Sequence, residues 1–335
     1  MCTVLLRLDP AADWPLLLAA VRDEVADRPW EPPGEYWPQE APGLVGGRDL
    51  LAGGTWLAVR RGGPHGGGGA ASSGAGSSGA GSSGAGPDGG MSGGVVSGGI
   101  VSGGVMSGGA MSGGAMFDGV APAGARPAGG SGPGVAAVLN GSFMNRLDRS
   151  APGSAPSSSR PSRGRLPLRA LTSGVPDAGR LREYEVVHLL VADADGARLV
   201  SWDGQEVTDT AIPPGDHIVT NEGLDVADDP LVPHFAPLLA GAGIPGGTRL
   251  SPDGPSGTDL PGPTTDWWGD WTHLLRGDGL AEDDPRALLV RHELPDGRVF
   301  GSVSATLLAL GREPGRVRMD FTGTPSNPEW KQVEV

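Results

Sequence analysis

The chain has 335 residues, a formal net charge of -14 and a single cysteine, Cys2. A surface this acidic repels phosphate backbones and anionic lipid headgroups, which argues against nucleic-acid binding. One cysteine excludes an intrachain disulfide and any zinc site built from several cysteines. No run of about 18 apolar residues is present, and Arg7 and Asp9 interrupt the apolar start, so we expect a cytoplasmic chain without a membrane span or signal peptide.

Short apolar segments bounded by turn residues predict most of the secondary structure. Strands are expected at residues 3–8, 15–21, 55–61, 135–141, 184–193, 197–204, 216–221, 286–293, 299–310 and 316–323. Helices are expected at residues 166–174, 230–241 and 265–277. Several hairpins with few helices predict an α+β fold in which the helices cover the sheets.

Residues 62–134 hold half of the 60 glycines and consist largely of repeats such as GAGSS and SGGVV. Glycine at this density loses much conformational entropy on ordering, and two small apolar residues per repeat bury too little surface to offset that loss. We therefore expect a disordered insert that interrupts a single domain spanning residues 1–335. The strands at 55–61 and 135–141 are expected to pair, with the insert at the tip of their hairpin.

The position of Cys2 suits its thiol to nucleophilic chemistry. After removal of the initiator methionine, Cys2 would carry a free α-amine, which titrates near pH ~8 and can accept the thiol proton without a histidine. Asp23 could orient that amine, and Arg22 could either hold a substrate carboxylate or lower the thiol pKa. Asn140 and Asn221 each end an apolar strand, where a side-chain amide can donate to an oxyanion. The alternative is that Cys2 is simply a small buried residue at the start of a strand.

Six stretches spread along the chain outside the insert share a pattern with a known family. They are MCTVLL (1–6), VRDE followed by DRP (21–29), GGRDLLAGGTWLAV (46–59), VAAVLNG (135–141), HIVTNEGLD (217–225) and FGSVSATLLAL (300–310). Together they resemble the NRDE family, also described as the transport and Golgi organisation type. The combination of VRDE, DRP and GRDLLAGGTWLAV is the most specific part of this resemblance.

The NRDE family is in turn similar to the N-terminal-nucleophile (Ntn) hydrolases, and this resemblance implies a fold and a chemistry. The implied fold is an αββα sandwich of two antiparallel sheets between helical layers. By similarity, Cys2 is the nucleophile, Arg22 and Asp23 support it, Asn140 donates to the oxyanion and Asn221 makes a second polar contact. The implied reaction is hydrolysis of a non-peptide linear amide through a thioester, without a metal or cofactor.

Two positions depart from the family pattern. Val21 stands where the name-giving Asn-Arg-Asp-Glu tetrad has asparagine, and Val303 stands where a later block usually has arginine. Both changes replace a polar or charged group with an aliphatic one. They therefore predict a more apolar site and weaken the prediction of hydrolytic activity.

A non-catalytic function on the same fold is the alternative prediction. The family resemblance implies it as well, because family members are associated with haem trafficking and with lipid or acyl-CoA homeostasis. The cleft would then carry haem or an apolar acyl ligand, and Cys2, His188, His217 or His234 could ligate the haem iron. A lone histidine on a strand is more often structural.

Two further features leave alternatives open. Six tryptophans could rim a ligand cleft, or could instead pack loops onto the core. They are Trp30, Trp37, Trp56, Trp267, Trp268 and Trp271. The glycine-rich insert could be a flexible linker or an interaction scaffold, and the partners of such a scaffold are not indicated by the sequence.

Overall fold

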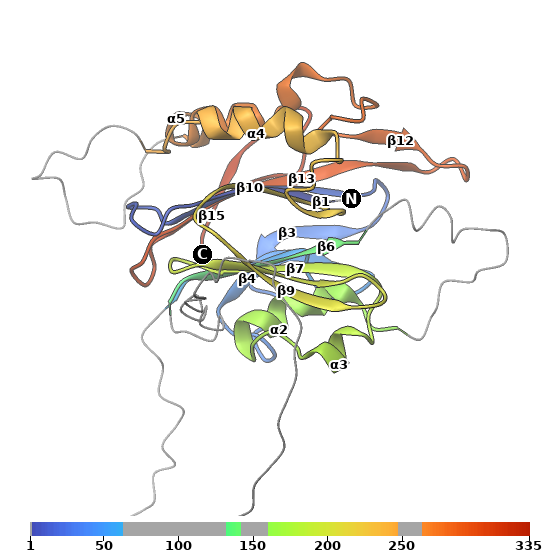
Figure 1. Ribbon diagram of the computed structural model, residues 1–335, viewed down its shortest axis with the longest axis vertical. Helices are drawn as coiled ribbons and strands as arrows, with labels where there is room; N and C mark the ends of the chain where they lie inside the picture. The colour runs from blue at the N-terminus through green and yellow to red at the C-terminus, as the bar shows by residue number, and fades with distance from the viewer. Residues whose placement is uncertain (1, 63–131, 142–159, 247–262) are drawn as a thin grey trace, which may run out of the picture. The chain divides into compact units, whose positions relative to one another are not determined.

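A computed structural model describes residues 2–62, 132–141, 160–246 and 263–335 of the chain. All of these residues belong to one compact unit, formed by Met1–Gly66 and Ala123–Val335. The strands of the described residues form two antiparallel sheets, named sheet A and sheet B (Figure 1).

Sheet A contains the chain's first and last described strands. Its order is β11 (Gly223–Leu224), β10 (Gly215–Thr220), β1 (Cys2–Leu8), β2 (Leu16–Val25), β13 (Val299–Leu310), β14 (Val317–Thr322) and β15 (Lys331–Val333), with β12 (Arg291–Glu293) also paired to β13. The order of sheet B is β3 (Trp30–Gly34), β4 (Leu44–Asp49), β5 (Leu57–Arg60), β6 (Gly134–Asn140), β7 (Val187–Asp193), β8 (Ala197–Trp202) and β9 (Val207–Ile212).

Alternating side chains of each central strand pack on opposite faces of its sheet. In β2, Leu16 and Leu18 join an apolar cluster that contains residues of both sheets. Leu17 lies between these two residues and Val21 lies further along the strand, and both join a second cluster on the opposite face. Side chains alternate along a strand with a period of two, so one face of sheet A packs against sheet B and the other packs against helices.

Helices cover the outer face of each sheet. Sheet A is covered by α4 (Leu231–Gly241), α5 (Thr264–Trp268) and α6 (Asp270–Leu274), and sheet B by α2 (Leu166–Thr172) and α3 (Ala178–Leu181). Two short 3-10 turns, η1 (Arg163–Arg165) and η2 (Gly277–Gly279), adjoin these helices. Figure 1 shows the resulting order of helices, sheet A, sheet B and helices. The predicted α+β fold with two antiparallel sheets between helical layers is therefore confirmed.

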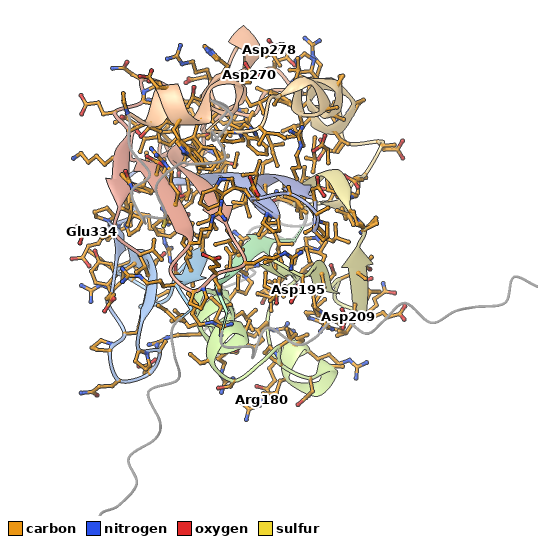
Figure 2. The ribbon with its side chains drawn as sticks, turned by 90° about the vertical axis from the view of Figure 1, so that its left-hand side faces the viewer. Arg180, Asp195, Asp209, Asp270, Asp278 and Glu334 are labelled. Atoms are coloured by element: carbon orange, nitrogen blue, oxygen red, sulfur yellow. The ribbon has the colours of Figure 1, made fainter. Side chains whose placement is uncertain are left out.

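Several charged side chains lie on the outside of this unit. Arg180, Asp195 and Asp209 are exposed and point outward from the sheet B side (Figure 2). Asp270 is exposed on the opposite, helix-covered side of sheet A. Within the described ranges, no helix is long and apolar enough to cross a membrane.

The strands on either side of the glycine-rich insert pair as the sequence predicted. Leu57 lies opposite Ala137 and Arg60 lies opposite Gly134 in the antiparallel pairing of β5 with β6. Gly62 has a φ of 70°, and a Cβ there would lie 2.5 Å from the nitrogen of Pro133, so only glycine permits this close approach. Most of the insert lies outside the described residues, so its disorder and the single-domain organisation remain predictions.

Two helical predictions differ from the structure in instructive ways. The segment at 265–277 contains two short helices because Gly269 has a φ of 52° and a ψ of -120°, which a continuous helix cannot include. The segment at 230–241 forms a single helix despite its two prolines. Pro233 lies in the first turn, where a backbone N–H has no helical partner, and Pro237 costs one internal hydrogen bond.

Three strands of sheet B, β3, β4 and β9, were not predicted. The sequence of β9, VTDTAI, is mostly exposed at the edge of the sheet, so it lacks the apolar pattern that predicts strands. The sequence of β3, WEPPG, reads as a loop, but prolines are tolerated at the edge of a sheet, which is where β3 lies. The sequence of β4, LVGGRD, has two glycines that resemble a turn. Conversely, the strand expected at 286–293 is reduced to the three residues of β12.

Removing residues 63–131 should leave the fold intact. The deletion would join β5 to β6 through Arg61, Gly62, Gly132 and Pro133, because Arg60 and Gly134 are already paired. Shortening the loop lowers its closure entropy by roughly 2 to 3 kcal/mol, so we expect a melting temperature at least equal to that of the full chain. Circular dichroism during thermal unfolding measures this. Loss of cooperative unfolding would contradict the expectation, whereas an intact fold with lost function would favour the scaffold alternative.

Candidate functional site

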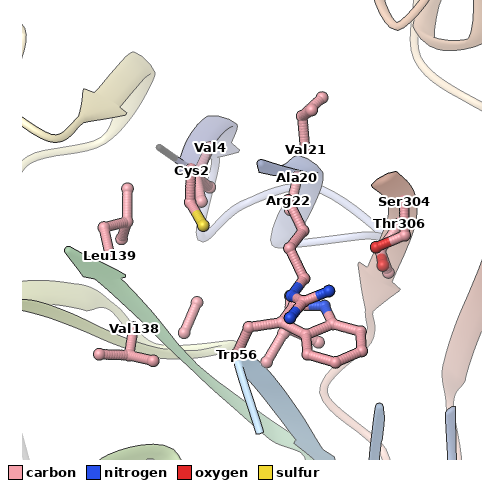
Figure 3. A pocket seen from close by; sticks show the side chains of 12 residues that line it. Cys2, Val4, Ala20, Val21, Arg22, Trp56, Val138, Leu139, Ser304 and Thr306 are labelled. Carbon is pink, nitrogen blue, oxygen red and sulfur yellow. The ribbon is translucent and has the colours of Figure 1, made fainter. Parts of the chain in front are cut away.

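Three polar side chains lie in a row across neighbouring strands of sheet A. Cys2 is opposite Arg22 in the pairing of β1 with β2, and Arg22 is opposite Ser304 in the pairing of β2 with β13. Directly opposed residues share one face of a sheet, so the three side chains point to the same side. Ala20, two residues before Arg22, packs against sheet B, which places the row between the two sheets. Figure 3 shows these side chains around the pocket that they line.

Regular alternation along β13 places Ser304 on the same face as Leu308 and Leu310, and a β-bulge at Val303 removes Ser302 from that alternation. Ser302 pairs with Asp23 and Ser304 pairs with Arg22, so Val303 is the extra residue of the bulge. In a regular strand, Ser302 and Ser304 would share a face, because side chains alternate with a period of two. The bulge instead lets the Ser302 hydroxyl donate a hydrogen bond to Asp23 Oδ1 at 2.6 Å while Ser304 lies beside Arg22.

The guanidinium of Arg22 is buried with few hydrogen-bond partners. Its side chain is 4% exposed, and its Nη2 lies 3.6 Å from Glu24 Oε2 and 3.6 Å from Asp49 Oδ2, which is longer than a hydrogen bond. Nη1 has no hydrogen-bond partner among the described residues. The guanidinium also lies 4.3 Å from the centre of the Trp56 ring, a cation–π contact. Arg22 therefore keeps donor capacity that the described residues do not use.

Trp56, just before β5, forms the side of the site that sheet B contributes. It reaches Arg22 because Gly47 has no side chain: a Cβ on Gly47 would lie 2.0 Å from the indole. The ring of Trp30 packs edge-on against Trp56, with 5.9 Å between ring centres. The position of the Arg22 guanidinium is thus fixed by aromatic packing as well as by charge.

Asn221 is held directly beside the backbone nitrogen of Cys2. Asn221 is 3% exposed, and its Oδ1 accepts a hydrogen bond from the Cys2 nitrogen at 3.1 Å. The backbone carbonyl of Asn221 accepts from His188 Nε2 at 2.9 Å, and the Ser201 hydroxyl lies 2.7 Å from His188 Nδ1. A carbonyl oxygen can only accept, so Nε2 carries the proton. His188 belongs to sheet B and Asn221 follows a strand of sheet A, so this bond joins the two sheets next to Cys2.

Cys2 lines a polar cleft with a volume of about 170 Å³. Asn140, at the end of β6, lines the same cleft. Its charged lining residues are Arg22, Asp23, Glu24, Arg28, Asp49 and Arg163. Arg28 is the tight partner of Asp49, with Nε 2.6 Å from Asp49 Oδ2. The lining thus contains both positive and negative groups.

A second, narrower crevice shares Cys2 and Arg22 with this cleft. Its volume is about 10 Å³, enough for roughly one water-sized atom. Ser304 lines the crevice together with apolar side chains, among them Leu57 and Leu139 from sheet B. The thiol and the guanidinium therefore stand between a wide polar space and a narrow apolar one.

Burial shifts the pKa values of the two titratable groups nearest the amino terminus. Burial raises the pKa of the Cys2 thiol. This effect outweighs the amino-terminal charge, a hydrogen bond with the Asp23 backbone and the charge of Arg22, all of which lower the pKa. Burial likewise raises the pKa of Asp23 to about 6, against the amino-terminal charge and the hydrogen bond from Ser302. At neutral pH, Asp23 is therefore mostly ionised and the thiol is protonated.

The structure brings together all five residues that the sequence singled out. Cys2, Arg22, Asp23 and Asn140 line the wide cleft, and Asn221 bonds to the Cys2 nitrogen. Their proximity is a structural observation, and their chemical roles remain predictions. Among the described residues, no group of three or more His, Cys, Asp or Glu side chains is arranged to hold a metal ion.

The two departures from the family pattern have different structural settings. Val21 is 1% exposed and packs among the helices on the outer face of sheet A. Val21 is also among the residues that line the narrow pocket of Figure 3, where its side chain extends to the side opposite Arg22. Its aliphatic side chain therefore packs with the helical layer. Val303 is the bulged residue that separates Ser302 from Ser304.

The other two histidines considered as ligands bond to carboxylates outside the cleft, and most of the six tryptophans pack in the core. His217 Nδ1 lies 2.7 Å from Asp225 Oδ2, and His234 Nε2 lies 3.0 Å from Asp278 Oδ2. Trp267, Trp268 and Trp271 are buried in the cluster beneath the sheet A helices, and Trp37 is buried against the sheet B helices. Of the six tryptophans, Trp56 lines the cleft, so most of them pack the core.

Sequence reasoning missed several residues of the site. Ser302 and Ser304 flank Val303 in the stretch GSVSAT, and a serine on each side of one residue in an apolar strand is the signal that could have drawn notice. His188 was considered as a haem ligand, but in the structure it supports Asn221. The fit of Trp56 against Gly47 depends on a contact that no local pattern shows.

The fold and the site define an αββα protein with a polar cleft around a cysteine at position 2. Residues 1–66 match the family model described as Transport and Golgi organisation 2. This match includes Cys2, Arg22, Asp23 and Trp56, and it confirms the predicted family resemblance over that part of the chain. No curated protein matches the chain.

The raised pKa of Asp23 predicts a pH-dependent stability. Its pKa is about 6 in the folded chain and about 4 when unfolded, so between these values the folded state holds the proton more tightly. The contribution of Asp23 to stability is therefore present below pH 4 and lost as the pH rises through 6, at a cost of about 3 kcal/mol. Asp23→Asn mimics the neutral acid, so its stability relative to the wild type should increase by up to that amount between pH 4 and pH 7.

Urea unfolding of both proteins at several pH values measures this difference. Comparing the two proteins at each pH cancels the titration of the other groups. Parallel stability curves for wild type and Asp23→Asn would contradict the raised pKa.

Proposed function

We propose that this chain, after removal of Met1, is a hydrolase that uses Cys2 as its nucleophile on a non-peptide linear amide. One observation carries the proposal: the Cys2 nitrogen lies 3.1 Å from Asn221 Oδ1 while Cys2 and Asn140 line the same cleft. A nucleophile, a base and an oxyanion donor around one space are the parts that acyl transfer requires. We place this reaction in the cytoplasm.

The first half-reaction forms a thioester. The Cys2 α-amine accepts the thiol proton, which it must do because burial keeps the thiol protonated at neutral pH. The sulfur then attacks the carbonyl carbon, and Asn140 donates to the developing oxyanion. As the carbon–nitrogen bond breaks, the proton passes from the α-amine to the leaving nitrogen.

The second half-reaction releases the acid. The α-amine takes a proton from a water molecule, whose oxygen attacks the thioester carbonyl. The carbon–sulfur bond breaks, the sulfur recovers its proton, and a carboxylic acid leaves the cleft. Throughout, Asn221 Oδ1 accepts a hydrogen bond from the amine, and ionised Asp23 supplies a negative charge near it.

The alternative proposal is non-catalytic carriage of haem or of a lipid or acyl-CoA ligand in the same cleft. Arg28 and Arg163 on the cleft wall favour an anionic headgroup. Of the four residues considered as haem ligands, Cys2 lines this cleft and the three histidines are not among its lining residues, which makes Cys2 the candidate haem ligand. The small volume of the apolar crevice, about 10 Å³, gives an acyl chain little space.

Mass spectrometry of the intact protein tests the hydrolase proposal. We expect Met1 to be absent and incubation with a panel of acyl amides to leave an acyl group on Cys2. The Cys2→Ala variant should carry no adduct. Asn140→Ala should slow acylation by about 100-fold or more, because it removes an oxyanion donor.

The same experiment can overturn the proposal. Retention of Met1, or acetylation of the Cys2 nitrogen, would remove the base and end the mechanism. With Met1 absent, failure of a broad acyl panel to modify Cys2 would favour the carrier alternative. A haemin titration that gives a Soret band in the wild type and not in Cys2→Ala would support that alternative.

A further inference from the structure

Two buried donors beside Cys2 have no hydrogen-bond partner among the described residues. They are Arg22 Nη1 and Ser304 Oγ, on side chains that are 4% and 1% exposed. Both residues line the narrow crevice that also contains Cys2. Buried polar atoms are almost always hydrogen-bonded, so two unpartnered donors in one crevice indicate that a ligand atom binds there.

The chemistry of the two donors selects an oxygen ligand. A guanidinium has only N–H donors, and a serine hydroxyl can donate one further hydrogen bond to the same acceptor. The crevice volume of about 10 Å³ admits roughly one oxygen atom. Arg22 also lines the wide cleft, so a second oxygen of the same group can remain on that side. A carboxylate has two such oxygens in the planar arrangement that arginine binds best.

The two carboxylates nearest Arg22 do not hydrogen-bond to it. Asp49 is held by Arg28 at 2.6 Å, and both Glu24 and Asp49 remain 3.6 Å from Arg22 Nη2. The positive charge of Arg22 is thus only loosely paired. Arg22 also lowers the pKa of the Cys2 thiol, but burial outweighs this effect and the pKa is raised overall.

We propose that Arg22 and Ser304 form a carboxylate-binding subsite beside the Cys2 sulfur, so that the ligand of this cleft is a small molecule bearing a carboxylate. The proposal rests on the proposed function for the reaction of Cys2, but carboxylate binding itself needs no catalysis. The regular pairing of β13 with β2 from Ser304 to Leu310 is what sets Ser304 opposite Arg22, and the bulge at Val303 moves Ser302 to Asp23.

Alkylation of Cys2 by two matched reagents tests the subsite. Iodoacetate carries a carboxylate and iodoacetamide carries a neutral amide of the same size. Each forms a bond between the sulfur and the methylene carbon, releases iodide and sends the thiol proton to solvent. We expect the rate ratio of iodoacetate to iodoacetamide at Cys2 to exceed the ratio for N-acetylcysteine by about tenfold, the effect of a hydrogen bond to a charged group.

Three variants test which side chains cause the preference of Cys2 for iodoacetate over iodoacetamide. Ser304→Ala removes one donor and should lower the ratio several-fold, and Arg22→Gln should abolish the preference. Thr306→Val removes the other hydroxyl that lines the crevice, one that is not among the unpartnered buried atoms of the described residues, and should retain the preference. In a second arm, propionate should slow alkylation of the wild type by iodoacetamide, whereas propionamide should not.

Two results would overturn the subsite. One is a wild-type ratio equal to that of N-acetylcysteine together with no protection by propionate. The other is a preference that persists in both Ser304→Ala and Arg22→Gln, which would assign it to other cations of the cleft such as Arg28.

The outcome is separable from that of the proposed function. A carboxylate preference without any acyl adduct would sustain the subsite and reject the hydrolase. An acyl adduct on Cys2 without the carboxylate preference would sustain the hydrolase and reject the subsite.

Discussion

The register of three neighbouring strands, β1, β2 and β13, is the constraint on which the site depends. It sets Cys2, Arg22 and Ser304 in one row on the face of sheet A that meets sheet B. A shift of one residue in either pairing would turn a polar side chain of this row into the helical layer and an apolar one into the site. The apolar alternation of β2 opposes such a shift, because Leu16 and Leu18 must face sheet B. The core thus fixes the geometry of the cleft.

Polar groups in this location reduce the stability of the fold. Arg22, Asp23 and Ser304 are each at least 96% buried, between the apolar cluster shared by the two sheets and the charged lining of the cleft. Burial opposes the charged forms of the first two, as the lowered pKa of Arg22 and the raised pKa of Asp23 indicate. Groups that cost stability and converge on one space are characteristic of functional sites. That cost supports a functional interpretation of the cleft, since packing alone would favour aliphatic residues there.

Both sheets contribute to the surroundings of Cys2. Sheet A supplies the thiol, while sheet B supplies His188, which holds the Asn221 segment, and the strand that ends in Asn140. The Trp56 ring approaches Arg22 from the segment before β5. Relative movement of the sheets would therefore change the distances among the nucleophile, the amide and the guanidinium together. The apolar cluster shared by the two sheets makes such movement costly.

The sequence by itself determined the strand-rich fold, the pairing of β5 with β6 and the four polar residues that converge on Cys2, because apolar periodicity and strand ends are local features. It missed β3 and β4, whose prolines and glycines resemble turns, and the mostly exposed edge strand β9. Only the tertiary structure decided that Val21 faces the helices, that Ser304 faces Arg22 and that His188 supports Asn221. Those outcomes depend on the register of paired strands and on contacts between the two sheets. Such contacts join residues far apart in the chain, so no local pattern in the sequence specifies them.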